Sequence, residues 1–420
     1  MNEAFTASFP DALDELHVAY EQVPFFGRHL DAAGLRPDDI RTPEDFRRVP
    51  PTAKPDYRRN FPAGVLVRGA TLNDPFIFRS RSSGTTGDRL LTVTHTFTLA
   101  DRMRATTSVN PDLLAVFATA RDQRVCRYAP PNCSDVECAT PFTTPESRTL
   151  ADGTLVLPVA HDLLATPDVM VEQAVAELDA YRPHWLYADP QHLAFLVRGM
   201  RRLGIPPPEV GGIVLAYNVV TAASRRQITE FFAPGTVVAE VASMSELGWL
   251  GMTCPSHFLH LNTESFYLEL VDDGDGLPEL YVTSIGDGLS PHIRYRTGDL
   301  YTAVDGDCPC GHPFPRAVHQ GRRKDVMRAA DGSALLTPGQ LDRLVGPAPW
   351  LDAYKLRQLG PDRFDFRYVP SAAGADDVSP TVHDELRAAL GGGHLAFDAA
   401  TYIESERSGK LMPCVNEVPA

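Results

Sequence analysis

Six small residues in a row constrain this chain more than any other stretch. They combine four hydroxyl groups with two glycines and no carboxylate: Ser82, Ser83, Gly84, Thr85, Thr86 and Gly87. Glycine adopts backbone conformations that other residues avoid, and successive backbone N–H groups in such a turn converge on an anion. The stretch therefore suits a phosphate group. The alternative is a polar hairpin turn, since glycine, serine and threonine are common in turns.

The residues on either side indicate what kind of loop this is. No Gly-Lys-[Ser/Thr] follows, so it is not a Walker phosphate loop. Phe76 leads into it, and apolar and polar residues alternate from Leu91 to Thr94, as in a half-buried strand. We expect the loop to join two strands, so that backbone donors rather than a helix dipole would hold the anion.

Composition narrows the class of protein. A length of 420 residues favours two domains, and 43% hydrophobic with 22% charged residues is typical of a soluble globular chain. The net charge of −15 argues against non-specific binding to nucleic acid. A run of about 18 apolar residues and a signal peptide are both missing. Seven cysteines without a secretion signal fit a reducing compartment, so we expect a cytoplasmic protein that does not bind membranes.

Helix-like and strand-like segments alternate through the middle of the chain. Residues 171–180 have the pattern of a helix, 183–187 and 212–215 that of buried strands, and 223–232 that of a further helix. Such alternation predicts an α/β protein in which helices cover layered sheets.

The pattern changes after about residue 320. Phe364, Phe366 and Tyr368 alternate as in a strand, and Ser379-Pro380 provides an N-cap and a first-turn proline for a helix. We therefore predict a large N-terminal domain, residues 1–320, and a small α+β domain, residues 321–420.

Four further motifs follow the hydroxyl-rich loop in a fixed order: Ser243-Met244-Ser245-Glu246, Tyr295-Arg296-Thr297-Gly298-Asp299, Gly321-Arg322-Arg323-Lys324-Asp325 and Ser408-Gly409-Lys410. Together with the loop they resemble the adenylate-forming superfamily of acyl-CoA ligases, adenylation domains and luciferases. The N-terminal stretches Val23-Pro24-Phe25-Phe26, Asp38-Asp39-Ile40 and Pro51-Thr52-Ala53-Lys54 resemble the phenylacetate-CoA ligase branch in particular. The resemblance covers essentially the whole chain.

The resemblance assigns the phosphates and the metal of an ATP site. Ser82, Thr85 and Thr86 would hold the β- and γ-phosphates, and Glu246 would help to hold Mg²⁺, a hard cation that prefers carboxylate oxygen. Thr86, Glu246 and Lys410 are the implied catalytic residues. A lysine can reach the α-phosphate and the substrate carboxylate as a point charge on a flexible stem. The plain alternatives are a solvated glutamate at a helix start and a solvated lysine near the chain end.

The remaining nucleotide contacts are assigned in the same way. Asp299 would accept hydrogen bonds from both ribose hydroxyls, unless it is simply a turn residue after Gly298. Arg322 would reach the ribose or the phosphates, and Ser245 belongs to the same site. Lys324 falls at the hinge on which the small domain rotates between two reaction steps, although a charged linker is the simpler interpretation.

Three departures from the family pattern concern the nucleotide and acyl pockets. Ala242-Ser243 replaces the usual Tyr-Gly, Ala216-Tyr217-Asn218 replaces Gly-Gly-Glu, and Asp88-Arg89 replaces Lys-Pro after the loop. Tyr217 and Asn218 are therefore placed in the nucleotide or acyl pocket. A reshaped pocket indicates a specialised acid, as used in secondary metabolism.

Cysteine and histidine residues gather in two stretches that resemble a zinc site of some phenylacetate ligase relatives. Zinc prefers four cysteine or histidine ligands, and a match at His260-Leu261-Asn262 selects a set of four: Cys254, His260, Cys308 and Cys310. His257 and His312 are substitutes for a member of this set. The alternative is reduced cysteines packed as small hydrophobic residues.

The resemblance implies an AMP-forming ligase. It would activate a small carboxylic acid, aromatic in class, with ATP and Mg²⁺, and transfer the acyl group to a thiol of coenzyme A or of a carrier-protein phosphopantetheine arm. An amine acceptor and a degenerate, non-catalytic nucleotide-binding homologue are the alternatives. A monomer and a homodimer are equally compatible with the sequence.

Overall fold

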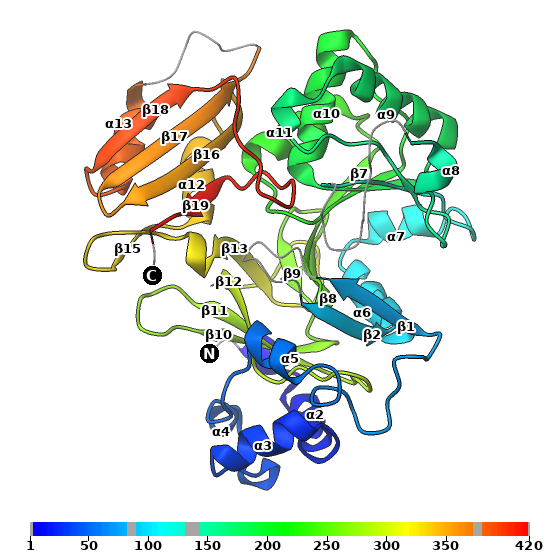
Figure 1. Ribbon diagram of the computed structural model, residues 1–420, viewed down its shortest axis with the longest axis vertical. Coiled ribbons are helices and arrows are strands. Elements are labelled where there is room, and N and C mark those ends of the chain that lie inside the picture. The colour runs from blue at the N-terminus through cyan, green and yellow to red at the C-terminus, as the bar shows by residue number, and fades with distance from the viewer. Residues whose placement is uncertain (1–2, 82–89, 131–142, 373–379, 419–420) are drawn as a thin grey trace. The chain divides into compact units, whose positions relative to one another are not determined.

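The computed structural model describes residues 3–81, 90–130, 143–372 and 380–418 (Figure 1). Its contacts group the chain into two compact units. The first unit comprises residues 1–111 and 241–319, and the second unit comprises residues 112–240 and 320–420. The predicted division of the chain between residues 320 and 321 stays a prediction.

The first unit begins with short helices whose starts are set by proline and capping residues. Pro24 and Pro43 lie in first turns, where a missing N–H costs no helical hydrogen bond. Thr42 and Asp45 form a reciprocal capping box. The helices are α1 (Glu3–Thr6), α2 (Phe9–Gln22), α3 (Pro24–Ala32), α4 (Pro43–Phe46), α5 (Lys54–Asn60) and α6 (Thr96–Thr107), with a 3-10 turn at Pro37–Asp39.

A hairpin and a sheet complete the first unit. The hairpin pairs β1 (Ile77–Arg81) with β2 (Leu91–His95). The sheet has the order β10-β11-β12-β13-β9-β8-β7. Its strands are β7 (Val237–Met244), β8 (Gly248–Thr253), β9 (Leu259–Leu261), β10 (Phe266–Val271), β11 (Glu279–Ser284), β12 (Tyr295–Val304) and β13 (Arg316–Arg322). Aromatic side chains such as Phe26, Phe46 and Phe266 pack in its core.

The second unit contains a parallel sheet, built from the alternating helices and strands that the sequence pattern predicted. Its order is β7-β6-β5-β3-β4, and the predicted strand 212–215 coincides with β6. The strands are β3 (Val125–Tyr128), β4 (Leu155–Val156), β5 (Trp185–Ala188) and β6 (Gly212–Leu215). The helices are α7 (Pro111–Phe117), α8 (Pro145–Arg148), α9 (Asp168–Tyr181), α10 (Pro190–Leu203) and α11 (Ala222–Phe231), with a 3-10 turn at Leu163–Ala165. The predicted α/β class is confirmed.

A smaller sheet follows in the same unit, with the order β18-β17-β16-β19. Apolar residues of α12 and α13, including Leu341 and Leu386, share one core with Tyr354, Phe364 and Phe366 of the strands. The elements are a 3-10 turn at Arg323–Asp325, β14 (Met327–Arg328), β15 (Ala334–Leu336), α12 (Pro338–Val345), β16 (Leu351–Gly360), β17 (Arg363–Pro370), α13 (Pro380–Ala389), β18 (His394–Ala399) and β19 (Cys414–Asn416). The predicted helix is present from Pro380, whereas Ser379 lies outside the described residues.

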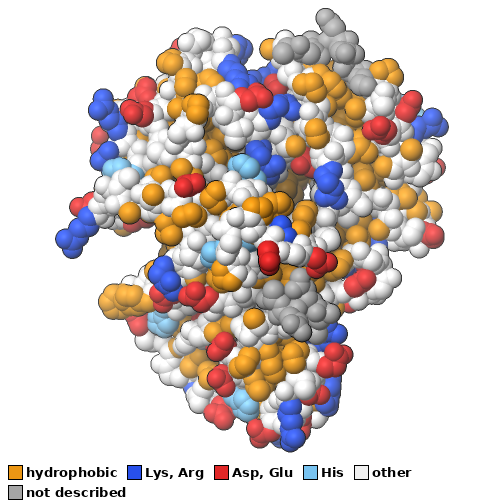
Figure 2. All heavy atoms as spheres, turned by 180° about the vertical axis from the view of Figure 1, so that it is seen from behind, with side chains coloured by type: hydrophobic (Ala, Val, Ile, Leu, Met, Phe, Trp, Pro, Cys, Tyr) orange, Lys and Arg blue, Asp and Glu red, His pale blue; other side chains and the backbone are white. Residues whose placement is uncertain are grey.

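Among the described residues, the helices are too short or too polar to cross a bilayer. On the face drawn in Figure 2, acidic and basic side chains are interspersed among apolar ones.

Candidate active site and metal centre

The hairpin of β1 and β2 lies on either side of the hydroxyl-rich loop. The prediction that this loop joins two strands is confirmed, because Arg81 and Leu91 pair directly across the hairpin. The loop residues Ser82, Ser83, Gly84, Thr85, Thr86 and Gly87 lie outside the described residues. Thr92 of β2 donates hydrogen bonds to the carbonyl oxygens of Ser80 (3.3 Å) and Ser245 (3.0 Å). The loop's second strand is thus joined to the motif that contains Glu246.

Glu246 lies in the tight turn between β7 and β8 and is buried. Its carboxylate forms an ion pair with Lys54 Nζ at 2.9 Å and accepts a hydrogen bond from the Tyr295 hydroxyl at 3.3 Å. The alternative of a solvated glutamate at a helix start is therefore wrong. A buried carboxylate is stable only with such partners, and its second oxygen remains chemically suited to a hard cation.

Sequence reasoning did not identify Lys54 as a site residue. Lys54 begins α5, two residues after Thr52. The backbone N–H and hydroxyl of Thr52 donate to the carbonyl oxygens of Arg294 and Ile293. These bonds fix the start of α5 against the strand that contains Tyr295. The only signal in the sequence was that Lys54 ends one of the stretches quoted for the family resemblance.

Asp299 lies within β12, in a turn-like irregularity of the strand. Gly298 has φ of 76°, a conformation that favours glycine, and its N–H donates to Glu279 at 3.1 Å. Arg296 also pairs with Glu279, at 2.9 Å. The Asp299 side chain is 13% exposed, with His319 Nε2 at 4.0 Å from its carboxylate. The local structure therefore holds a partly accessible two-oxygen acceptor in a fixed place.

Lys410, Tyr217 and Asn218 come together in the second unit. Lys410 Nζ donates to the carbonyl oxygen of Tyr217 at 2.5 Å, and Asn218 Nδ2 donates to the carbonyl oxygen of Leu411 at 2.8 Å. Tyr217 and Asn218 follow β6 after Ala216. They lie at the carboxyl end of a parallel sheet, where ligands of α/β proteins commonly bind. Sequence reasoning placed these residues in one site, and the structure brings them into contact.

The region predicted as the hinge follows β13. Gly321 has φ of 94°, and a Cβ there would lie 2.4 Å from the Pro338 side chain, so no other residue fits without movement. Arg322 caps the 3-10 turn and is partly buried. Lys324 is 47% exposed and lies 3.9 Å from Asp325. The nucleotide role of Arg322 and the hinge role of Lys324 stay predictions.

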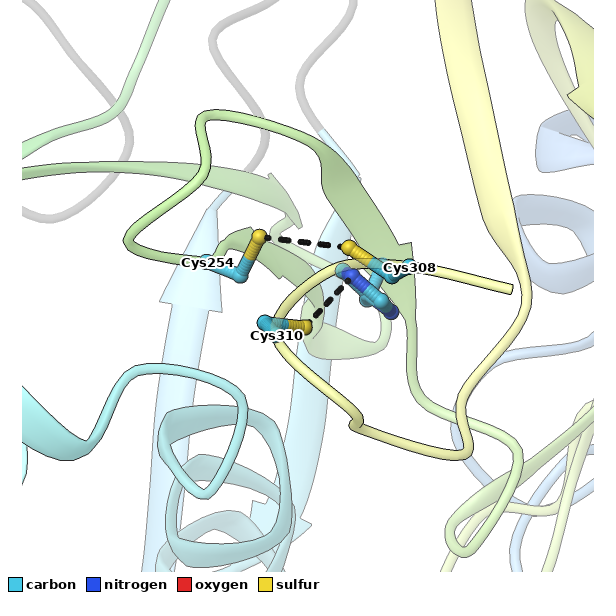
Figure 3. A group of neighbouring side chains, drawn as sticks. Cys254, Cys308 and Cys310 are labelled. Atoms are coloured by element: carbon cyan, nitrogen blue, oxygen red, sulfur yellow. Dashed lines mark hydrogen bonds between the residues drawn. The ribbon is translucent and has the colours of Figure 1, made fainter.

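The four predicted metal ligands form one cluster in the first unit. Cys254 and Cys308 Sγ are 3.8 Å apart, and Cys310 Sγ lies 3.4 Å from His260 Nε2. Figure 3 shows the three cysteines gathered together, with a dashed line between Cys254 and Cys308. All four ligand atoms lie within 4.8 Å of one another. A tetrahedral zinc site with bonds near 2.3 Å needs sulfur atoms about 3.8 Å apart, so these residues fit the ion.

The surroundings of the cluster also suit a metal. His260 Nδ1 lies 2.7 Å from the Phe314 carbonyl oxygen, which fixes the proton on Nδ1 and turns the Nε2 lone pair to the cysteines. Burial lowers the pKa of His260, which favours the neutral ligand form. Burial also raises the pKa of the Cys310 thiol to about 11, so a metal would have to displace the thiol proton on binding. His312 pairs instead with the Ser108 hydroxyl at 3.1 Å.

No family model matches the chain, but curated relatives do. A phenylacetate-coenzyme A ligase of Thermus thermophilus is 29% identical over 73% of this chain and 68% of its own length. The enzymes of the same name from Escherichia coli and Pseudomonas putida are 26% and 25% identical, over 74% and 88% of this chain and 69% and 79% of their own lengths. The matched regions include residues of both units, because each unit holds about half of the chain.

Solved structures show the same fold. A 2-hydroxyisobutyryl-CoA ligase in the postadenylation state is similar over 98% of this chain and 90% of its own, with a TM-score of 0.69 and 18% identity. An anthranilate CoA ligase in complex with anthranoyl-AMP has a TM-score of 0.54 and 16% identity, over 79% of this chain and 64% of its own. The chain is therefore similar in sequence to phenylacetate-CoA ligases, and it shares its fold with acyl-CoA ligases that form adenylates.

Proposed function

We propose that this chain is an AMP-forming ligase that activates a small aromatic carboxylic acid with ATP and transfers the acyl group to coenzyme A. The observation that carries the proposal is the similarity to phenylacetate-coenzyme A ligases, which spans up to 88% of the chain. Three residues in this order along the chain support the same activity. They are the buried Glu246, the partly accessible acceptor Asp299, and Lys410, whose ammonium donates to the Tyr217 carbonyl oxygen.

The first step would join the acid to AMP. A carboxylate oxygen attacks the α-phosphorus of ATP, and the bond from that phosphorus to pyrophosphate breaks. The protein needs to position the two anions and offset their charge rather than form a covalent bond. Lys410 Nζ is suited to this because it already donates to an oxygen, the Tyr217 carbonyl. A substrate anion is a stronger acceptor than a neutral carbonyl.

Two carboxylates of the first unit would serve the nucleotide. Glu246 would hold Mg²⁺, which when bound supplies positive charge to the phosphates. Lys54 now compensates the Glu246 charge, so it would move toward a phosphate oxygen as the cation binds. Asp299 would accept from the ribose hydroxyls, since its side chain is partly accessible and its backbone N–H is already bonded to Thr297.

The second step would pass the acyl group to a thiol. The thiolate sulfur attacks the acyl carbon, AMP leaves with the electron pair of the broken bond, and the thiol proton goes to solvent. The names of the curated relatives make coenzyme A our proposed acceptor. A carrier-protein arm and an amine are the other acceptors to be tested.

We also propose that Cys254, His260, Cys308 and Cys310 hold a structural zinc ion. The geometry of the ligand atoms and the second bond of His260 support this assignment. Four protein ligands leave no open position for a substrate, which is typical of structural rather than catalytic zinc.

Exchange of labelled pyrophosphate into ATP, measured across a panel of aromatic and aliphatic acids, tests the activity. We expect exchange with at least one aromatic acid, and a thioester when coenzyme A is added. Lys410→Ala should reduce exchange by about a thousandfold or more if it offsets transition-state charge, with ATP binding by calorimetry largely kept. A folded protein that exchanges with no acid would exclude the proposed function.

A further inference from the structure

The segment that carries Lys410 is a closed turn between β18 and β19, drawn in red in Figure 1. The Gly409 N–H donates to the Glu406 carbonyl oxygen at 2.7 Å, and the Glu406 N–H donates to the Lys410 carbonyl oxygen at 2.8 Å. Gly409 has φ of 80°, which favours glycine. These bonds tie Lys410 rigidly to Glu406, so whatever holds Glu406 also sets the position of Lys410.

Lys355 of β16 holds Glu406. Its ammonium donates to the Glu404 carbonyl oxygen at 3.0 Å and to the Glu406 carboxylate at 3.1 Å. Neighbours Tyr354 and Leu356 pack into the core with the helices, so Lys355 lies on the opposite face of the strand. Its side chain is only 9% exposed, and a lysine is rarely buried unless it is paired.

Further contacts of the second unit fix the far end of the turn. Leu411 packs with Ala353, Val369 and Ile403 on the same face of the small sheet, and its carbonyl accepts from Asn218. Leu411, directly after Lys410, is therefore anchored by apolar packing, whereas Glu404 and Glu406, directly before the turn closes, are held by the Lys355 ammonium. Loss of the ammonium would free one side of the turn alone.

We propose that Lys355 is a positioning residue for the adenylation step, which acts through Glu406 to place the Lys410 ammonium. This rests on the proposed function of Lys410. Lys355 itself touches neither substrate nor nucleotide in this role. A displacement of about 1 Å at a reacting group can cost about a hundredfold in rate, so an anchor of this kind changes rate without changing the chemistry.

Lys355→Met and Lys355→Arg test the proposal. Lys355→Met keeps the stem and removes the charge, and we expect kcat of pyrophosphate exchange to fall about ten- to a hundredfold, with KM for ATP changed less than about twofold. A cavity of about 240 Å³ lies beside Lys355. Lys355→Arg therefore has room to reach Glu406 and should recover most of kcat.

Arg357→Met is the matched control. Arg357 lies two residues along β16 on the same face and forms a two-bond ion pair with Glu417, at 2.8 and 3.0 Å. Glu417 follows β19 and does not belong to the turn that carries Lys410. We expect Arg357→Met to lower the melting temperature and to leave kcat within about twofold of wild type. Equal losses of kcat in Lys355→Met and Arg357→Met would overturn the proposal, because the effect would then be loss of stability alone.

A labelling experiment gives a readout that does not need activity. Trace acetic anhydride acetylates lysines, and peptide mass mapping gives the rate at Lys410 relative to the exposed Lys324 as an internal reference. Release of the turn in Lys355→Met should raise the relative rate at Lys410 several-fold, while Arg357→Met leaves it unchanged. An unchanged rate in Lys355→Met would refute the positioning role. Wild-type protein inactive with every acid would instead refute the proposed function, and the labelling result would still stand.

Discussion

The Glu246–Lys54 pair is the residue contact that most directly links stability to the proposed cation site. The side chain of Lys54 is 35% exposed, and that of Glu246 is only 2% exposed. The Glu246 carboxylate therefore needs Lys54 to compensate its charge, whereas water can solvate the Lys54 ammonium. Removing one partner of a buried pair leaves an uncompensated charge. Bound Mg²⁺ would instead provide the positive charge that compensates the Glu246 carboxylate.

We therefore predict that Lys54→Met lowers the free energy of unfolding by about 2 kcal/mol, since water reaches Lys54 and reduces the full penalty of a buried pair. Millimolar Mg²⁺ should restore part of the loss in the variant and change wild type less. Thermal unfolding with and without Mg²⁺ measures this, with Lys54→Arg as the control that keeps the charge. A variant insensitive to Mg²⁺ would argue against Glu246 as a magnesium ligand.

Tyr217 stores backbone strain beside the proposed catalytic lysine. Its φ is 71°, a conformation that costs a residue with a Cβ about 1 kcal/mol relative to glycine. The centroid of its ring lies 4.9 Å from that of the Tyr187 ring. Tyr217→Ala and Tyr217→Gly remove the same ring but differ in the Cβ. We predict that the glycine variant is the more stable of the two by about 1 kcal/mol in denaturant unfolding. The opposite order would mean that the strain is absent in solution.

At the scale of elements, local patterns predicted strands well and long-range pairs poorly. The predicted strand 212–215 is β6 itself, because an apolar run this short is typical of a buried strand rather than of a helix. Glu246 pairs with Lys54, and Lys355 with Glu406, across long stretches of chain. Nothing in the local sequence of these residues shows which opposite charge they meet. The metal cluster was the exception, because the resemblance to relatives with a zinc site, through the match at His260-Leu261-Asn262, selected the four residues.

The cluster connects β9 with the loops that follow β8 and β12. We predict about one zinc per chain by elemental analysis after metal-replete purification, and loss of zinc together with a lower melting temperature in Cys308→Ser and Cys310→Ser. His257→Gln is the matched control, because His257 is exposed and lies outside the set of four. Zinc loss in His257→Gln would show that the ligand assignment is wrong, and a stoichiometry near zero in wild type would end the zinc proposal.

At the scale of the whole molecule, the chain passes between its two units at the start of α7 and inside β7 and β13. Composition changes near residue 320, and sequence reasoning could find that point. The grouping of residues 1–111 with 241–319 has no such local mark. It depends on contacts such as those of Glu15, whose carboxylate accepts from the N–H groups of Gly286 and Asp287.

Glu15 and His292 make opposite contributions to the pH dependence of stability. Burial, and then the nearby Asp287 charge, raises the pKa of Glu15 from 4.5 to about 7. Folding therefore favours the protonated acid, and this contribution is lost as pH rises from 4.5 to about 7. Burial lowers the pKa of His292 from 6.5 to about 4, so its contribution is lost as pH falls through that range. The contributions of Glu15 and His292 to the free energy of unfolding therefore change with pH in opposite directions, each by at most about 1.4 kcal/mol per pH unit. They cancel between about pH 4.5 and 6.5.

Glu15→Gln should remove the contribution of Glu15 to the pH dependence of stability and leave that of His292 unopposed. Between about pH 4.5 and 6.5 we predict that the free energy of unfolding of the variant rises with pH, by up to about 1.4 kcal/mol per unit more steeply than that of wild type. Urea unfolding at several pH values measures both slopes, and the difference between the two proteins removes the contribution of every other titrating group. Parallel curves would show that Glu15 ionises near its ordinary pKa in the folded chain, and that the hydrogen bonds from Gly286 and Asp287 offset its burial.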